Sequence, residues 1–154
     1  MKEIDYKNYE CPSDYYKADG GSNIIRVVSK GFMAKEHGMR TAGRYLPLGE
    51  CVGANCEHCK AGREAKIKYK WIVLDRAKQR LRLLHAGKSL GDGIASIGKK
   101  FGDPQEYDLE ITRKGEGRDT NYTVIKASVN TELGEKDKVI IDNAKTYLVN
   151  KYFK

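Results

Sequence analysis

Alternation of apolar and polar residues is clearest in the middle of the chain, in "KIKYKWIVLD" at residues 66–75. In an extended strand, Tyr69 and Trp71 fall on one face while Lys68 and Lys70 fall on the other. The pattern predicts a strand with one apolar face and one basic face.

Four further segments have the β-rich composition of strands: residues 23–29, 80–86, 105–113 and 120–128. The segment at 80–86 follows a short turn and is the expected hairpin partner of residues 66–75. The last two segments are joined by "KGEGRD", a glycine-bearing hairpin loop. In "QEYDLEITR", Tyr107 and Leu109 are expected to face inward and Asp108 to face water.

Two segments have the apolar spacing of helices. Residues 88–102 carry such a stripe, although Gly91 and Gly93 lower its helix propensity. Residues 138–152 carry a second stripe, and Asp137 is placed to cap that helix.

The remaining segments show no clean period. Residues 1–22 are expected to be a loose lead-in, and residues 30–65 an irregular segment that something must hold together. The chain at 1–154 is expected to form one mainly β domain with helices, of the α+β class. Five short strands, one internal helix and a terminal helix predict a small β-dominated barrel, for which a five-stranded OB-like barrel with an insertion at about 30–65 is a natural candidate.

Charge changes this picture, because it is concentrated in one stretch. The net charge is +8; residues 60–100 hold twelve Lys and Arg against three Asp and Glu, a net +9, which leaves −1 elsewhere. A positive stretch on a near-neutral body indicates a polyanion binder, and the alternative is a solvated lysine-rich surface. The sequence has neither a membrane-spanning apolar run nor an apolar leader, so the cytosol, or that of a host cell, is the expected location.

The stretch "CVGANCEHCK" places Cys51, Cys56 and Cys59 within nine residues. Cytosolic thiols stay reduced, so clustered cysteines indicate metal ligands before disulfides. A Cys-x2-Cys pair also occurs in thiol-redox sites, but those sit where a strand enters a helix. We therefore expect one structural zinc ion, which can supply the folding energy that an irregular segment lacks.

A structural zinc site usually has four protein ligands, so one more is needed. His37 is the leading candidate, with Cys11 and His58 as alternatives. His58 lies inside the Cys-x2-Cys turn and is expected to point away from the ion. Zinc deaminases pair such cysteines with His-x-Glu, whereas His37 is followed by "GM", so the general acid/base of that reaction is missing.

At this point the sequence resembles a family. "GGSNIIRVV", a His followed about a dozen residues later by Cys, the Cys-x2-Cys, the Lys/Tyr/Trp-rich strand and "GDPQEYDLEITRKGEGRDTNYTV" occur in that order over roughly residues 20–128. They resemble the single-stranded DNA-binding (helix-destabilising) proteins of T-even and related bacteriophages. The resemblance implies an OB-like fold with an embedded zinc subdomain, whose zinc ligands here would be His37, Cys51, Cys56 and Cys59.

The resemblance also implies a function: sequence-tolerant binding of single-stranded DNA during phage-type replication, recombination or repair. Replication or recombination proteins, and self-association on DNA, are the implied partners. The family's basic N-terminal segment and acidic tail are not matched, because this chain starts with "MKEIDYKNYE" and ends with "LVNKYFK".

Single strands are bound by basic grooves and by aromatic faces on which bases stack. The candidate DNA contacts are Lys66, Lys68, Tyr69, Lys70, Trp71, Arg76, Arg80, Arg82, Arg44, Tyr45 and Tyr122. Lysines and rings alternate between the two strand faces, so either the rings stack bases or they belong to the core while the lysines touch DNA. For Trp71, the core is the favoured alternative.

The sequence shows no nucleophile–base pair and no carboxylate dyad, so an enzyme is not predicted. Two other functions stay open: an RNA-binding zinc-OB module, and a zinc-stabilised interaction protein that binds an acidic protein partner.

Overall fold

The computed structural model describes residue 1, residues 3–7 and residues 13–153. Its strands are β1 (Gly21–Val27), β2 (Phe32–Thr41), β3 (Arg44–Glu50), β4 (Ala65–Asp75), β5 (Arg80–Ala86), β6 (Asp108–Lys114) and β7 (Asn121–Lys126). Its α-helices are α1 (Glu57–Lys60), α2 (Lys88–Phe101) and α3 (Glu135–Tyr152), and single 3-10 turns occur at Pro104–Glu106 and Gly117–Asp119.

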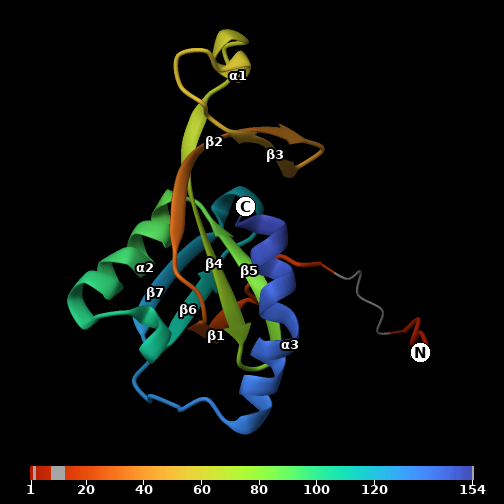
Figure 1. Cartoon of the computed structure of the whole chain (residues 1–154), viewed down its shortest axis with the longest axis vertical. Helices are drawn as coiled ribbons and strands as arrows, with labels where there is room; N and C mark the ends of the chain where they lie inside the picture. The colour runs from red at the N-terminus through yellow and green to blue at the C-terminus, as the bar shows by residue number, and fades with distance from the viewer. Residues whose placement is uncertain (2, 8–12, 154) are drawn as a thin grey trace.

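The strands form one antiparallel sheet in the order β3-β2-β4-β1-β6-β7, and β5 also pairs with β4. Val27 lies opposite Val73 and Phe32 opposite Lys70, so β1 and β2 occupy successive lengths of the same edge of β4. β5 pairs with the other edge of β4. The β2–β3 hairpin and α1 therefore project from one end of the molecule, with β4 running from them into the body (Figure 1).

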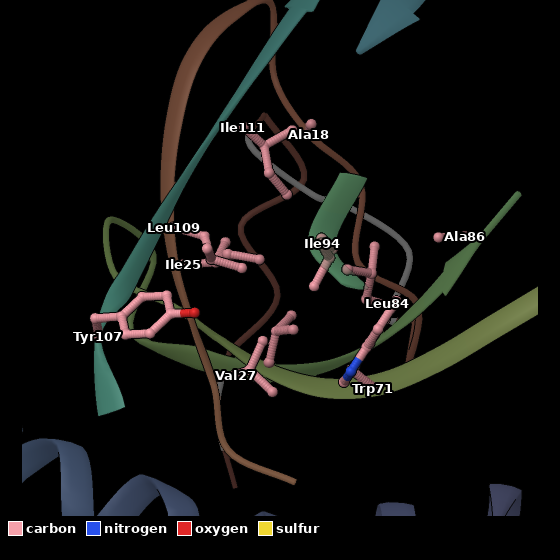
Figure 2. Packing of buried hydrophobic residues seen from close by; sticks show 11 residues of the cluster. Ala18, Ile25, Val27, Trp71, Leu84, Ala86, Ile94, Tyr107, Leu109 and Ile111 are labelled. Carbon is pink, nitrogen blue, oxygen red and sulfur yellow. The ribbon is translucent and has the colours of Figure 1, made fainter. Parts of the chain in front are cut away.

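An apolar core lies between the inner face of the sheet and α2. Its buried residues are Ala18, Ile25, Val27, Trp71, Val73, Leu84, Ala86, Ile94, Tyr107, Leu109 and Ile111, the cluster drawn in Figure 2. The predicted faces of β4 are confirmed, because Trp71 and Val73 enter this core while Ile72 and Leu74 point to the opposite side.

The two glycines of α2 explain why a sequence of modest helix propensity forms a helix here. A Cβ at Gly91 would lie 2.0 Å from the Tyr69 ring, and a Cβ at Gly93 would lie 2.6 Å from Val124. Glycine is therefore what lets α2 approach both β4 and β7 closely. The expected helix at 88–102 is confirmed.

A second core lies under α3, where Leu148 packs with Ile72 and Leu74 from the outer face of β4. The helix starts earlier than expected, at Glu135 rather than 138. Asp137 does act as a cap, but from inside the first turn, where its carboxylate accepts from the Gly134 N–H at 2.8 Å.

The expected solvent exposure of Asp108 is wrong. Asp108 is 1% exposed and accepts a hydrogen bond from Arg26 Nε at 2.8 Å. Arg76 lies 3.7 Å from the same carboxylate and 3.1 Å from Asp137, the residue that caps α3. A buried carboxylate is retained where it is paired in this way, and alternation in sequence does not reveal its partners.

The expected five-stranded barrel is also wrong. The structure is a seven-stranded open sheet, and in the described part of the chain β5 and β7 do not pair. Instead α2, seated by its two glycines, packs against β7 and β4.

The expected irregular segment at 30–65 is in large part a hairpin, β2–β3. It was missed because its large apolar side chains are exposed and follow no core-facing alternation; Phe32, Met33, Met39 and Leu46 are examples. Ala42 and Gly43, both with positive φ, form its two-residue turn.

The lead-in at 1–22 is more ordered than expected within its described part. Tyr15 forms a parallel bridge with Leu83 of β5, and Ala18 is buried in the inner core. Within the described residues, no helix is both long and apolar enough to cross a membrane.

Candidate metal centre and basic groove

Four potential metal ligands meet at the projecting end of the molecule. His37 comes from β2, Cys51 directly follows β3, Cys56 precedes α1 and Cys59 lies within it. Their ligand atoms all lie within 4.8 Å of one another. The sequence prediction that these four residues share one site is consistent with this cluster, which could hold a metal ion.

Three of the six separations among the four ligand atoms are close to those of a tetrahedral site. Cys51 Sγ lies 3.5 Å from Cys59 Sγ, and His37 Nε2 lies 3.4 Å from the sulfurs of both Cys56 and Cys59. A tetrahedral zinc ion with bonds of about 2.3 Å to sulfur and about 2.0–2.1 Å to nitrogen requires separations of roughly 3.5–3.8 Å. These three pairs therefore need to move apart only slightly to surround an ion, and all four ligand atoms lie within 4.8 Å of one another.

The His37 ring is oriented for coordination by its backbone neighbour. Its Nδ1 lies 3.1 Å from the carbonyl oxygen of Glu64, which can only accept, so Nδ1 carries the proton. The lone pair of Nε2 then points at the sulfurs. A carbonyl that fixes the tautomer of a metal-binding histidine is a common second contact in such sites.

Backbone geometry brings the thiols together and favours a thiolate. The Cys51 N–H donates to Lys35 O at 2.8 Å, which extends the hairpin to the cluster, and the Cys56 N–H donates to Gly53 O at 3.0 Å. The backbone N–H groups of Cys59 and Val52 lower the pKa of Cys56 to about 6. Interaction with Cys51, and then burial, raises the pKa of Cys59 to about 11. The cluster can thus carry negative charge for a cation.

The two alternative ligands differ in status. His58 lies outside the four-residue cluster; its Nδ1 faces the Arg63 guanidinium at 2.8 Å, as expected for a histidine pointing away from the ion. Cys11 lies outside the described residues.

The expected DNA contacts are divided among several parts of the molecule. Trp71 is buried in the inner core, and Tyr69 stacks on it with ring centroids 5.6 Å apart and donates to Asp92. Arg76 is engaged by Asp108 and Asp137. Trp71 thus belongs to the core, the alternative that the sequence favoured, and Arg76 is ion-paired, so neither lies free for DNA in this structure.

A second set gathers where the hairpin meets the sheet. The Lys68 ammonium lies 4.3 Å from the centroid of the Tyr45 ring, and Tyr45 donates to Glu36 at 3.1 Å. Lys68 and Lys70 are half-buried beside this carboxylate. Burial lowers the pKa of Lys68. Two further candidates, Lys66 and Arg44, are exposed on the strands around the hairpin.

Arg80 and Arg82 lie elsewhere, in a hollow of about 680 Å³ beside β5. Five basic residues line it, Lys17, Lys78, Arg80, Arg82 and Arg113, together with one carboxylate, Asp19. Within the described part of the chain, Nε of Arg80 and Nε of Arg113 are buried without a hydrogen-bond partner.

A second hollow, of about 480 Å³, adjoins the first, and both are lined by Lys17 and Ala18. Tyr122 lines this second hollow, as does Arg40 from the hairpin. We call the two hollows together the basic groove.

Sequence reasoning missed Lys17, Lys78, Arg40 and Arg113 as members of this groove. Arg113 is brought there by pairing of β6 with β1, where it lies opposite Gly21. Lys17 comes from the lead-in, which carries no periodic signal. Only Lys78, in the turn between β4 and β5, could have been proposed from its position in the basic stretch.

Comparisons with protein-family models, with curated proteins and with solved structures found no significant match for this chain.

Proposed function

We propose that this protein binds single-stranded DNA along the basic groove, with little dependence on sequence. The observation that carries the proposal is the 680 Å³ hollow, which is lined by five basic residues, three of them arginines, and by one carboxylate, Asp19, that is paired with Lys78. Phosphates are the anions that such forked donors bind best.

A single strand suits this groove better than a duplex. The second hollow continues the first and adds a ring, Tyr122, which is 38% exposed. Unpaired bases can stack on an exposed ring, whereas paired bases in a duplex are already stacked. The proposed activity would serve phage-type replication, recombination or repair, in line with the resemblance to helix-destabilising proteins.

We further propose that the ion of the metal centre is zinc and that its role is structural. Three thiols and one imidazole form a ligand set that zinc prefers. Four protein ligands leave no open position for a substrate, so zinc would hold the hairpin in place and a binding protein is favoured over an enzyme.

The strand order supports a relation between this sheet and the OB-like fold expected from the sequence. Without β2 and β3, the pairing order is β5-β4-β1-β6-β7, with α2 inserted between β5 and β6 in sequence. We propose that this is an opened OB-like sheet, with the metal-bearing hairpin inserted between its first two strands.

The test is a competition among single-stranded DNA, RNA of the same length and duplex DNA over a series of salt concentrations. If three to five groove cations neutralise phosphates, log K against log salt should have a slope of roughly −2 to −3.5 on the single strand. Single-stranded DNA should bind more tightly than duplex. Tighter duplex binding at every salt concentration would overturn the proposal. Tighter binding of RNA than of single-stranded DNA would mean that the groove binds single-stranded RNA instead.

Matched variants locate the site. Arg80→Glu with Arg82→Glu should abolish binding of single-stranded DNA. Lys136→Glu with Lys138→Glu is the control, because it makes the same change in net charge on the exposed surface of α3, and it should keep most of the wild-type affinity. Equal losses in both pairs would indicate attraction by net charge alone. Lys68→Glu with Lys70→Glu is the third arm, and complete loss in that variant would place the strand at the hairpin junction instead.

An acidic protein partner is the remaining alternative. If this alternative holds, single-stranded DNA, RNA and duplex DNA should all bind only through charge. Their affinity should then be lost at high salt, because no base stacking would remain.

A further inference from the structure

The second hollow of the basic groove differs from the first in its chemistry. Its lining combines the apolar core residues Leu84, Ala86 and Ile111 with rim residues that include Lys17, Arg40 and Tyr122. At about 480 Å³ it lies within the roughly 300–1,000 Å³ typical of sites for small organic groups.

The floor of this hollow is apolar and well fixed. Leu84, Ala86 and Ile111 are each at most 3% exposed, and all three belong to the inner core shown in Figure 2. A floor of packed core side chains favours a flat, apolar group. Its side chains have no hydrogen-bonding groups that would require a particular partner.

The position of the hollow follows from the open sheet. Its floor comes from β5 and β6, and one rim comes from β7 and the loop before it, which carry Tyr122 and Thr120. Because β5 and β7 do not pair in the described part of the chain, the inner face stays accessible there. Tyr122 at the rim offers one face of a ring to a group entering this space.

Cations flank the hollow on the sides along which a strand would arrive. Lys17 belongs to both hollows, and beyond it lie Arg82 and Arg113 of the first hollow. Arg40, exposed on β2, lines the second hollow. An apolar site between cationic flanks is complementary to one base between two phosphates of the same strand.

We propose that the second hollow takes one unpaired nucleobase of the bound strand, held against Tyr122 over the apolar floor, while neighbouring phosphates lie on the flanking cations. The proposal rests on the function proposed above and adds which chemical part of the strand occupies which hollow. Any of the four bases has the required flat face, so occupation of the hollow is compatible with sequence-tolerant binding.

The test uses two short strands of about 8 nucleotides, one with bases and one abasic, which carry the same phosphates. Wild-type protein should bind the strand with bases more tightly by roughly 5- to 150-fold, the factor expected for one stacked base. Tyr122→Leu should remove much of that advantage and leave the affinity for the abasic strand unchanged. Arg80→Glu with Arg82→Glu should weaken binding of both strands.

Phe101→Leu is the matched control, because Phe101 is also an exposed ring, 47% exposed, but does not line the groove. It should change neither affinity. If Tyr122→Leu weakens binding of both strands equally, or if the wild-type protein does not distinguish the strands, the base site is overturned while phosphate binding stands. If wild-type protein binds neither strand, both proposals are overturned together.

Discussion

The two ends of β4 are stabilised by different means. Toward the end of β4, Ile72 and Leu74 are fully buried between β5 and α3. Toward its start, the strand pairs with a hairpin whose Phe32 and Met33 are exposed, and burial is concentrated at the metal centre. Apolar burial can stabilise the body by itself, whereas we expect the hairpin to depend on a metal ion bound by its four ligands.

The largest expected effect is loss of the metal centre. Cys56→Ser should lower zinc content from about one per chain, because a structural site requires its full ligand set. Structural zinc contributes apparent free energies of about 10–16 kcal/mol in small peptides at pH 7, so β2 and β3 should lose amide protection from hydrogen exchange. Amides of β5 should stay protected.

The ligand set has its own controls. Cys11→Ser should keep the metal, while His37→Ala should lose it, and elemental analysis measures both. If the Cys11 variant loses the metal and the His37 variant keeps it, the fourth ligand is Cys11 and not His37. Freshly purified wild-type protein without metal would refute the centre itself.

The converse change is made in the inner core. Leu109→Ala removes a side chain that is 0% exposed and should lower the free energy of unfolding by about 2–5 kcal/mol. Denaturant titration measures this loss, and zinc stoichiometry should be unchanged. A variant that loses zinc in proportion to its stability would show that the two regions are one cooperative unit.

A smaller effect is expected where the two regions meet. The buried Glu36 carboxylate accepts from Tyr45 of β3 at 3.1 Å and lies 3.2 Å from His85 Nε2 of β5. Glu36→Ala leaves both groups without this partner and should cost about 1–3 kcal/mol. Glu50→Ala, an exposed change on β3, is the control and should be nearly neutral. If Glu36→Ala and Glu50→Ala lower the free energy of unfolding equally, the contacts of Glu36 do not stabilise the junction between the hairpin and the body.

The smallest effect concerns the segment before β1. The Lys151 ammonium, followed by the Tyr152 hydroxyl, holds the pKa of the Asp14 carboxyl below its usual 3.8. A carboxyl with a lowered folded-state pKa stabilises the protein at neutral pH, and this contribution is lost as pH falls through that pKa. Asp14→Asn should cost about 0.5–1 kcal/mol at pH 7, since the pair is partly exposed.

The pH dependence provides the check on that change. Thermal unfolding of wild type and Asp14→Asn should differ at pH 7 and converge as pH falls from 3.8 through the still lower pKa of the folded carboxyl, because the wild-type carboxyl is neutral only below that lower pKa. A constant difference across this range would assign the effect to packing instead of charge.

The difference between the apolar body and the metal-ligand hairpin also explains which elements could be predicted from the sequence. β4, β5 and α2 were predicted because each sends a regularly spaced row of side chains into a core, as Trp71 and Ile94 do, and this spacing is visible in the sequence. The hairpin leaves none, because few of its side chains enter a core. The metal cluster was nevertheless predicted, because Cys51, Cys56 and Cys59 are close in sequence.

Contacts between distant segments could not be predicted in this way. Arg76 looked like a DNA contact among other basic residues, and only the fold shows that Asp108 and Asp137 engage it. Arg113 and Lys17 reach the groove through strand pairing and through the path of the lead-in, and neither is encoded in local spacing.

The attachment of the lead-in to β5 has a consequence for aggregation. The Tyr16 N–H donates to Leu83 O at 2.8 Å and the Leu83 N–H donates to Asp14 O at 2.6 Å, so this part of the outer edge of β5 is already hydrogen-bonded. An open strand edge is a template for pairing with another copy of the chain. Residues 14–16 thus block edge-to-edge assembly along this part of β5, and we expect proteolytic removal of this short segment to make the protein prone to form β-linked aggregates.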